Sequence, residues 1–161
     1  MVAGPFDAER TDTHAQVAAD RTAVRLGLLG ILPFLVLSFW LAAIADGHPW
    51  RATTILLLTQ YAAIVLSFLG GIRWGLALRR ASPARAQELA MTMLPPLVAW
   101  ASLSVPLPYT FAVLAAAFAA QGAWDAFAVH AGAAPRWYGR LRGWLTIAVV
   151  AALVLAFLAT G

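Results

Sequence analysis

Two ionisable residues lie inside otherwise apolar stretches of this sequence, and they carry its clearest chemistry. Arg73 is followed by five uncharged residues before Arg79, and Asp125 by four before His130. On helices, both residues would lie roughly 6 to 8 Å from a helix end, at matching depths. An arginine that faces an aspartate offers bidentate hydrogen bonds and avoids the burial of an unpaired charge. We therefore expect an Arg73–Asp125 ion pair, which either locks two helices together or belongs to a proton or ion path.

A second set of polar side chains lies within the same apolar stretches and consists of Gln60, Tyr61 and Gln121. Gln121 is about one helical turn before Asp125, whereas Gln60 is nearer the opposite end of its own stretch. A lone amide in a membrane helix more often joins helices than binds a substrate. This cluster therefore predicts hydrogen bonds between helices, with a polar route for a transported species as the alternative.

The residue types that most catalytic sites need are missing or scattered. The chain has no cysteine, which excludes disulfides, thiolate metal sites and a cysteine nucleophile. His14, His48 and His130 are far apart in the sequence, and no carboxylate spacing resembles a zinc or di-iron site. Gly-x-Ser-x-Gly, Walker and dinucleotide-binding patterns do not occur. We expect no catalytic residues, no metal and no cofactor, and we do not expect an enzyme.

Five long apolar stretches must position these side chains: residues 24–45, 53–78, 89–105, 107–129 and 144–160. Each approaches the roughly 20 residues with which a helix crosses a hydrocarbon core of about 30 Å. With 62% apolar and 11% charged residues, the chain has too little polar surface for a soluble globule. We predict an all-α, multi-pass bundle of five transmembrane helices over residues 24–161, preceded by a flexible polar tail over residues 1–23. Pro95 and Pro96 predict that the third helix is kinked or broken.

The arginines predict the orientation of this bundle. The tail and two loops place nine arginines on one side of the five stretches, whereas Arg51 alone lies on the other. The nine are Arg10, Arg21, Arg25, Arg79, Arg80, Arg85, Arg136, Arg140 and Arg142. Because basic residues stay on the cytoplasmic side, we expect a cytosolic N-terminus and a periplasmic C-terminus in a bacterial inner membrane. Arginines at helix ends also favour lipid over nucleic acid as the partner of a chain with a net charge of +4.

Two further patterns predict contact surfaces. Ala63, Ser67, Gly71 and Gly75 recur every four residues, so they would form one stripe that lets another helix approach closely. We expect the stripe to pack on the alanine-rich fourth stretch, and association with a second copy or another membrane protein remains the alternative. A loop that could bind an anionic lipid headgroup is formed by Arg136, Trp137, Tyr138, Arg140 and Arg142.

Three parts of the sequence resemble a bacterial and mitochondrial membrane family that includes transmembrane protein 69 of animals. They are residues 61–75, Asp125 and residues 135–142. The most specific part is Ser-Phe-Leu-Gly-Gly-x-x-Trp-Gly over residues 67–75. The resemblance implies a five-helix, multi-pass protein of an inner membrane. The resemblance also implies that many members have histidine where Arg73 stands here. This difference weakens a proton relay through an imidazole and favours charge pairing.

Three functions are compatible with these patterns. The first function, that of a small structural or accessory membrane protein, explains the pattern of most residues. A small oligomeric transporter or channel would use Arg73, Asp125, Gln121 and Gln60 as its polar lining. A membrane enzyme that acts on lipid headgroups would use the arginine-rich loop, but it lacks a recognisable nucleophile or metal set. We expect the first of the three.

Overall fold

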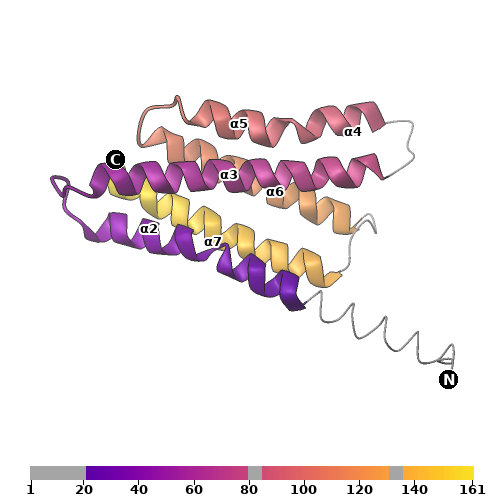
Figure 1. Cartoon of the computed structure of the whole chain (residues 1–161), viewed down its shortest axis with the longest axis horizontal. Coiled ribbons are helices and arrows are strands. Elements are labelled where there is room, and N and C mark those ends of the chain that lie inside the picture. Colours follow the sequence, from indigo (N-terminus) through magenta and orange to yellow (C-terminus); the bar gives the residue numbers. More distant parts are fainter. Residues whose placement is uncertain (1–20, 80–84, 131–135) are drawn as a thin grey trace, which may run out of the picture.

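The computed structural model describes residues 21–79, 85–130 and 136–161, and these residues are almost entirely helical. They form five rods along one long axis (Figure 1). The first rod contains residues 21–29 and α2 (Leu32–Ala43), the second is α3 (Arg51–Leu78), and the third contains α4 (Arg85–Thr92) and α5 (Leu94–Ser102). The last two rods are α6 (Tyr109–His130) and α7 (Arg136–Thr160). The predicted all-α architecture is therefore confirmed.

Among the described residues, four helices are long and apolar enough to cross a membrane: Arg21–Ala43, Arg51–Leu78, Tyr109–Phe127 and Gly139–Thr160. The predicted third span over residues 89–105 is different, because the chain forms two short helices with a turn at Met93. Pro95 and Pro96 lack the N–H groups that would continue the hydrogen bonds of α4. Together α4 and α5 run from Arg85 to Ser102, about 27 Å at 1.5 Å per residue.

The first rod is also interrupted, at Gly30 and Ile31. Pro33 follows as the second residue of α2, where a proline is tolerated at the start of a helix. The hydroxyl of Tyr61 on α3 donates a hydrogen bond of 2.9 Å to the carbonyl oxygen of Gly30. A carbonyl at the break is thus satisfied by the neighbouring helix, which ties the first rod to α3.

The buried core lies mainly between α2, α3, α6 and α7, with Ala99 of α5 added to it, and much of the outer surface is apolar as well. Phe34 is fully buried, with its ring 5.0 Å from that of Tyr61 and 5.7 Å from that of Phe118. Large apolar side chains such as Phe68 and Leu158 are nevertheless more than 60% exposed. A bundle that is apolar inside and outside is typical of a protein whose surrounding solvent is lipid.

The small-residue stripe on α3 has two different environments. Ala63 is buried and Ser67 is half-buried, and α3 contacts α6 as predicted. Gly71 and Gly75 are exposed, and a methyl group built on either glycine meets no atom of the described chain within 4 Å. The stripe is therefore not one continuous packing face within this chain. Whether its glycine end meets a second protein stays a prediction.

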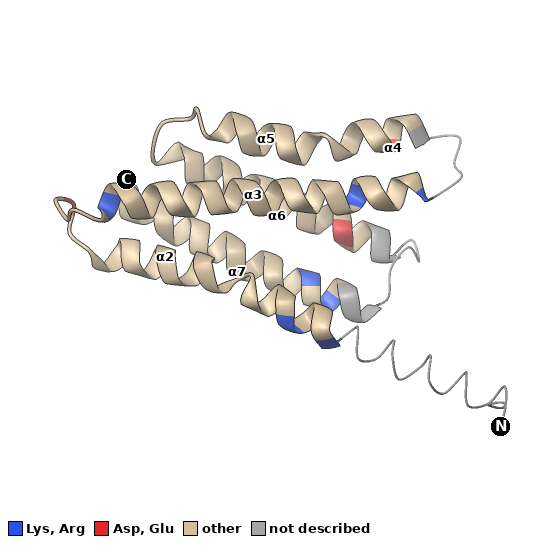
Figure 2. Ribbon diagram, viewed as in Figure 1, with Lys and Arg blue, Asp and Glu red and all other residues tan. Residues whose placement is uncertain are grey.

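Except for Arg51, the described arginines lie toward the end of the bundle where α3 ends and α7 begins. Arg51 lies at the other end (Figure 2). The Nη2 group of Arg51 donates to the carbonyl oxygen of Ala159 and pairs with Asp46 at 2.9 Å. Its Nη1 group donates to the carbonyl oxygens of Leu41 and Ile44 at 3.4 and 3.3 Å. Carbonyls at helix C-termini lack intrahelical donors and carry a partial negative charge. One guanidinium therefore fastens the ends of α2 and α7 to the start of α3.

We expect Arg51→Gln to lower the free energy of unfolding by about 1–2 kcal/mol, because backbone acceptors on two helices lose a charged donor. The measurement is the unfolding midpoint of the purified protein in detergent. Arg79→Gln is the matched control, since Arg79 is exposed at the opposite end, and we expect a change below about 0.5 kcal/mol. Equal midpoints for the two variants would contradict the role assigned to Arg51.

Candidate functional site

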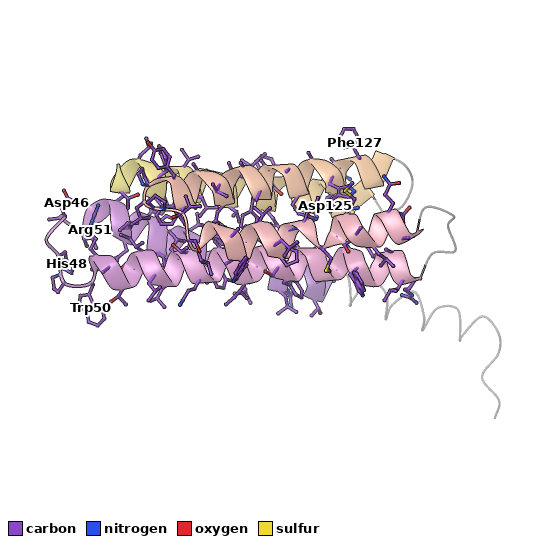
Figure 3. The ribbon with its side chains drawn as sticks, turned by 90° about the horizontal axis from the view of Figure 1, so that it is seen from above. Asp46, His48, Trp50, Arg51, Asp125 and Phe127 are labelled. Carbon is purple, nitrogen blue, oxygen red and sulfur yellow. The ribbon has the colours of Figure 1, made fainter. Side chains whose placement is uncertain are left out.

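A buried carboxylate joins three helices at the arginine-rich end of the bundle. Arg73 of α3 donates from Nε and Nη2 to Oδ1 of Asp125 on α6, at 3.0 and 2.7 Å. Arg142 of α7 donates from Nε and Nη2 to Oδ2 of the same residue, at 2.8 and 2.6 Å. Figure 3 shows Asp125 between the helices, whereas Phe127 points away from the bundle. We call Arg73, Asp125 and Arg142 the charge cluster.

The packing of α6 on α7 sets the register of this cluster. Gly122 lies nearly one turn before Asp125, and Thr146 lies one turn after Arg142. A methyl group built on Gly122 would lie 2.6 Å from both Cγ2 and Oγ1 of Thr146, so only glycine permits this approach. Because the two backbones come so close at this level, the side chains of Asp125 and Arg142 can meet across the contact.

Neighbouring residues on α6 support the arginine from α3. The guanidinium carbon of Arg73 lies 4.7 Å from the ring centroid of Trp124, which is a cation–π distance. Gln121 reaches toward Asp125 from the preceding turn, with its Nε2 atom 3.5 Å from Oδ1. The Oε1 atom of Gln121 is buried and has no hydrogen-bond partner in the described part of the chain. Arg73 is thus held by an ion pair and an aromatic face at the same time.

The charge cluster carries one negative and two positive charges in a largely buried setting. The side chains of Asp125, Arg73 and Arg142 are 8%, 14% and 12% exposed. A carboxylate offers about four lone-pair positions, and four guanidinium N–H donors approach them here, with the Gln121 amide as a fifth donor at 3.5 Å. Hydrogen bonds between charged groups are stronger than neutral ones, and a buried charge needs such partners. This arrangement is well suited to linking helices and poorly suited to a free base or ion ligand.

Comparison with known proteins places the chain in a family. The family model described as "Protein of unknown function (DUF3429)" matches residues 19–158. The chain belongs to this family. The matched segment contains all three residues of the charge cluster and all five rods except the last two residues of α7. The predicted family resemblance is therefore confirmed, and this DUF3429 member is a multi-pass membrane protein.

Two relatives share the printed name transmembrane protein 69. The protein of Xenopus tropicalis is 32% identical over 156 residues, which cover 92% of this chain and 58% of the relative. The protein of Mus musculus is 35% identical over 85 residues, which cover 52% of this chain and 34% of the relative. The chain therefore matches less than two thirds of the length of either relative. No solved structure matches it.

The structure brings the predicted pair of Arg73 and Asp125 together but changes the prediction for the arginine-rich loop. Arg142 is part of the loop that could bind a lipid headgroup, whereas its guanidinium turns inward to Asp125. The reason is that α7 begins at Arg136 rather than at residue 144, so Arg142 lies about 9 Å inside a helix. Arg140 is exposed. The side chains of the remaining loop residues, Arg136, Trp137 and Tyr138, lie outside the described part.

The three polar residues do not form one cluster in this DUF3429 member. Gln60 is exposed, and the Tyr61 hydroxyl is bound to Gly30. Both residues are 12 or more positions before Arg73 on α3, or about 18 Å along the helix. Only Gln121 lies beside the charge cluster. In the described residues, no group of three or more histidine, aspartate or glutamate side chains is placed to hold a metal ion.

Sequence reasoning missed the part that Arg142 plays. The signal was present, because Arg142 is the last charged residue before a long apolar stretch that ends the chain. Like Arg73 and Asp125, it lies a few residues inside a helix at the arginine-rich end. With the helix start at Arg136 instead of residue 144, the matching depths of Arg73, Asp125 and Arg142 would have predicted a cluster of three rather than a pair.

Proposed function

We propose that this protein is a small structural or accessory protein of the bacterial inner membrane, with a cytosolic N-terminus and a periplasmic C-terminus. The observation that carries the proposal is the double occupancy of Asp125, whose two oxygens are bound by arginines from two other helices. Such a carboxylate fixes α3, α6 and α7 relative to one another. A rigid bundle with an apolar exterior is suited to holding a position within a larger membrane assembly.

The arginine distribution supports the proposed orientation. In the described chain, Arg51 lies at one end of the bundle, and six arginine side chains lie toward the other end, where the first rod begins. The six are Arg21, Arg25, Arg73, Arg79, Arg140 and Arg142. The positive-inside rule assigns the end with more arginines to the cytosol. We expect alkaline phosphatase fused after Gly161 to be active in the periplasm. A fluorescent protein at the same position that folds and emits in the cytosol would contradict this orientation.

A transporter would need polar groups at successive depths along one path. The residues expected to line such a path lie far apart, since Gln60 is exposed and distant from the charge cluster. We expect proteoliposomes with the purified protein to leak ions and small solutes no faster than protein-free vesicles. Flux that stops in a folded Arg142→Gln variant would overturn the structural role, because that variant still retains the pair of Arg73 and Asp125.

The accessory role also predicts a specific neighbour in the membrane. A photo-crosslinking residue at Phe68, which is 65% exposed on α3, should capture the same membrane protein in repeated experiments. A matched probe at Leu158 on α7, which is 69% exposed, tests whether capture depends on which surface of the bundle carries the probe. Crosslinks that differ at random between preparations, or that occur equally from both faces, would argue against a fixed assembly.

A further inference from the structure

We propose that the protein binds the phosphodiester headgroup of an anionic phospholipid at a basic patch formed by Arg21, Arg25 and Arg140. The patch shares Arg140 with the loop expected from the sequence but takes its other two arginines from the first rod, and the inference goes beyond an accessory role. Its residues come from opposite ends of the chain. Two belong to the start of the first rod, and the third belongs to the start of α7 (Figure 2).

The first rod and α7 run side by side in the same direction, which brings the patch together. Their C-terminal ends share the guanidinium of Arg51, which binds Leu41 and Ala159. Near their N-terminal ends, a methyl group built on Gly27 would lie 3.4 Å from Cδ1 of Leu145. Measured along the axes from this contact, Arg25 lies about 3 Å, Arg140 about 8 Å and Arg21 about 9 Å toward the same end. The three arginines therefore occupy one end of one interhelical contact.

The positive charge of the patch is not neutralised by acidic residues of the described chain. Arg21, Arg25 and Arg140 are all exposed. Asp46 lies at the opposite end of the bundle and pairs with Arg51, and Asp125 is occupied by the charge cluster. Glu88 belongs to α4, which packs against α3 and α5 rather than α7. Behind the patch, the charge cluster adds a further net positive charge.

The surroundings of the patch favour a phospholipid over a soluble anion. Trp144 is 73% exposed and lies one turn from Arg140 on the same face of α7, as aromatic residues do at the level of lipid headgroups. Leu28 and Leu29, three and four residues after Arg25 on the first rod, are 53% and 57% exposed, where acyl chains would lie. Guanidinium groups bind phosphate oxygens in a bidentate manner. Basic sites between membrane helices are suited to anionic headgroups.

The test is lipid binding by the full chain in detergent micelles, followed by native mass spectrometry. Phosphatidylglycerol and phosphatidylcholine with identical acyl chains are titrated against the wild type and Arg25→Gln/Arg140→Gln. Each arginine near an anionic headgroup contributes a factor of about five in affinity. We therefore expect the double variant to bind phosphatidylglycerol about 25-fold more weakly, with unchanged binding of phosphatidylcholine. Arg79→Gln, an exposed arginine on α3, should retain wild-type binding.

Three results would overturn the proposal. Equal phosphatidylglycerol binding by the double variant and the wild type would exclude the patch as the site. An equal loss in Arg79→Gln would indicate a diffuse field rather than a site. Displacement of the lipid by an equal concentration of glycerol phosphate would show that a free phosphate, not a lipid, is bound. Unfolding midpoints of all variants are measured first, and Arg25→Gln alone replaces the double variant if that variant does not fold. None of these results depends on a protein partner.

Discussion

Asp125→Asn is expected to lower the free energy of unfolding by about 3–5 kcal/mol, because it leaves two largely buried guanidiniums without a counter-charge. In the wild type, one carboxylate accepts hydrogen bonds from both Arg73 and Arg142. An asparagine offers a single acceptor oxygen, and its NH₂ group would face an arginine donor. A loss of this size is comparable to the whole stability of a marginal protein. It would appear as a low yield of folded protein and a lowered unfolding midpoint in detergent.

Arg142→Gln is the informative comparison. It removes one of two positive charges and leaves the neutral pair of Arg73 and Asp125. We therefore expect a smaller loss, about 1–2 kcal/mol. The double variant Asp125→Asn/Arg142→Gln should be more stable than the sum of the two single effects predicts, because only one unpaired guanidinium remains.

A second control separates burial from charge. Asp46 also pairs with an arginine, but its side chain is 95% exposed, and exposed ion pairs contribute little. Asp46→Asn should therefore leave the unfolding midpoint nearly unchanged. A stable, fully folded Asp125→Asn variant would show that the charge cluster does not hold the helices together, and it would remove the main support for a structural role.

The pair of Arg73 and Asp125 could be predicted because depth along a helix is a one-dimensional property. Counting residues to the helix ends placed both side chains at the same level, and the cost of a buried charge then demanded a partner. Arg142 could not be placed in the same way, because apolar composition suggested that its helix begins at residue 144. The helix begins eight residues earlier, at Arg136, with polar residues in its first turns. The apolar stretch predicts where a helix enters the lipid, whereas the helix itself can begin earlier among polar residues.

The interruption of the third rod could be predicted from Pro95 and Pro96, because a proline without an N–H group removes a helix hydrogen bond at its own position. The packing of α3 was less accessible. A four-residue period selected Ala63, Ser67, Gly71 and Gly75. Among the glycines of α3, however, the one that packs closely on a neighbouring helix is Gly70. Which side of a helix faces a neighbour depends on where that neighbour lies, and small residues on two adjacent sides of α3 gave no means to choose between them.

Gly70 and its neighbour Gly71 therefore provide a matched pair for the second prediction. A methyl group at position 70 would lie 2.8 Å from Cδ of Pro96 and 3.0 Å from the carbonyl oxygen of Thr92. Neither atom is at the end of a flexible side chain. We expect Gly70→Ala to lower the free energy of unfolding by about 1–3 kcal/mol, because α3 must move away from the break between α4 and α5. The measurement is the unfolding midpoint in detergent.

Gly71→Ala should have the opposite sign, because a methyl group there meets no atom within 4 Å. Alanine is favoured over glycine in a helix by up to about 1 kcal/mol, so the variant should be as stable as the wild type or more stable. Pro96→Ala offers a further test, since it removes the ring carbon nearest to position 70. Adding Gly70→Ala to that background should cost less than in the wild type. Equal effects of the two glycine substitutions would instead mean that α3 does not pack through Gly70, and that the broken third rod lies elsewhere on the bundle.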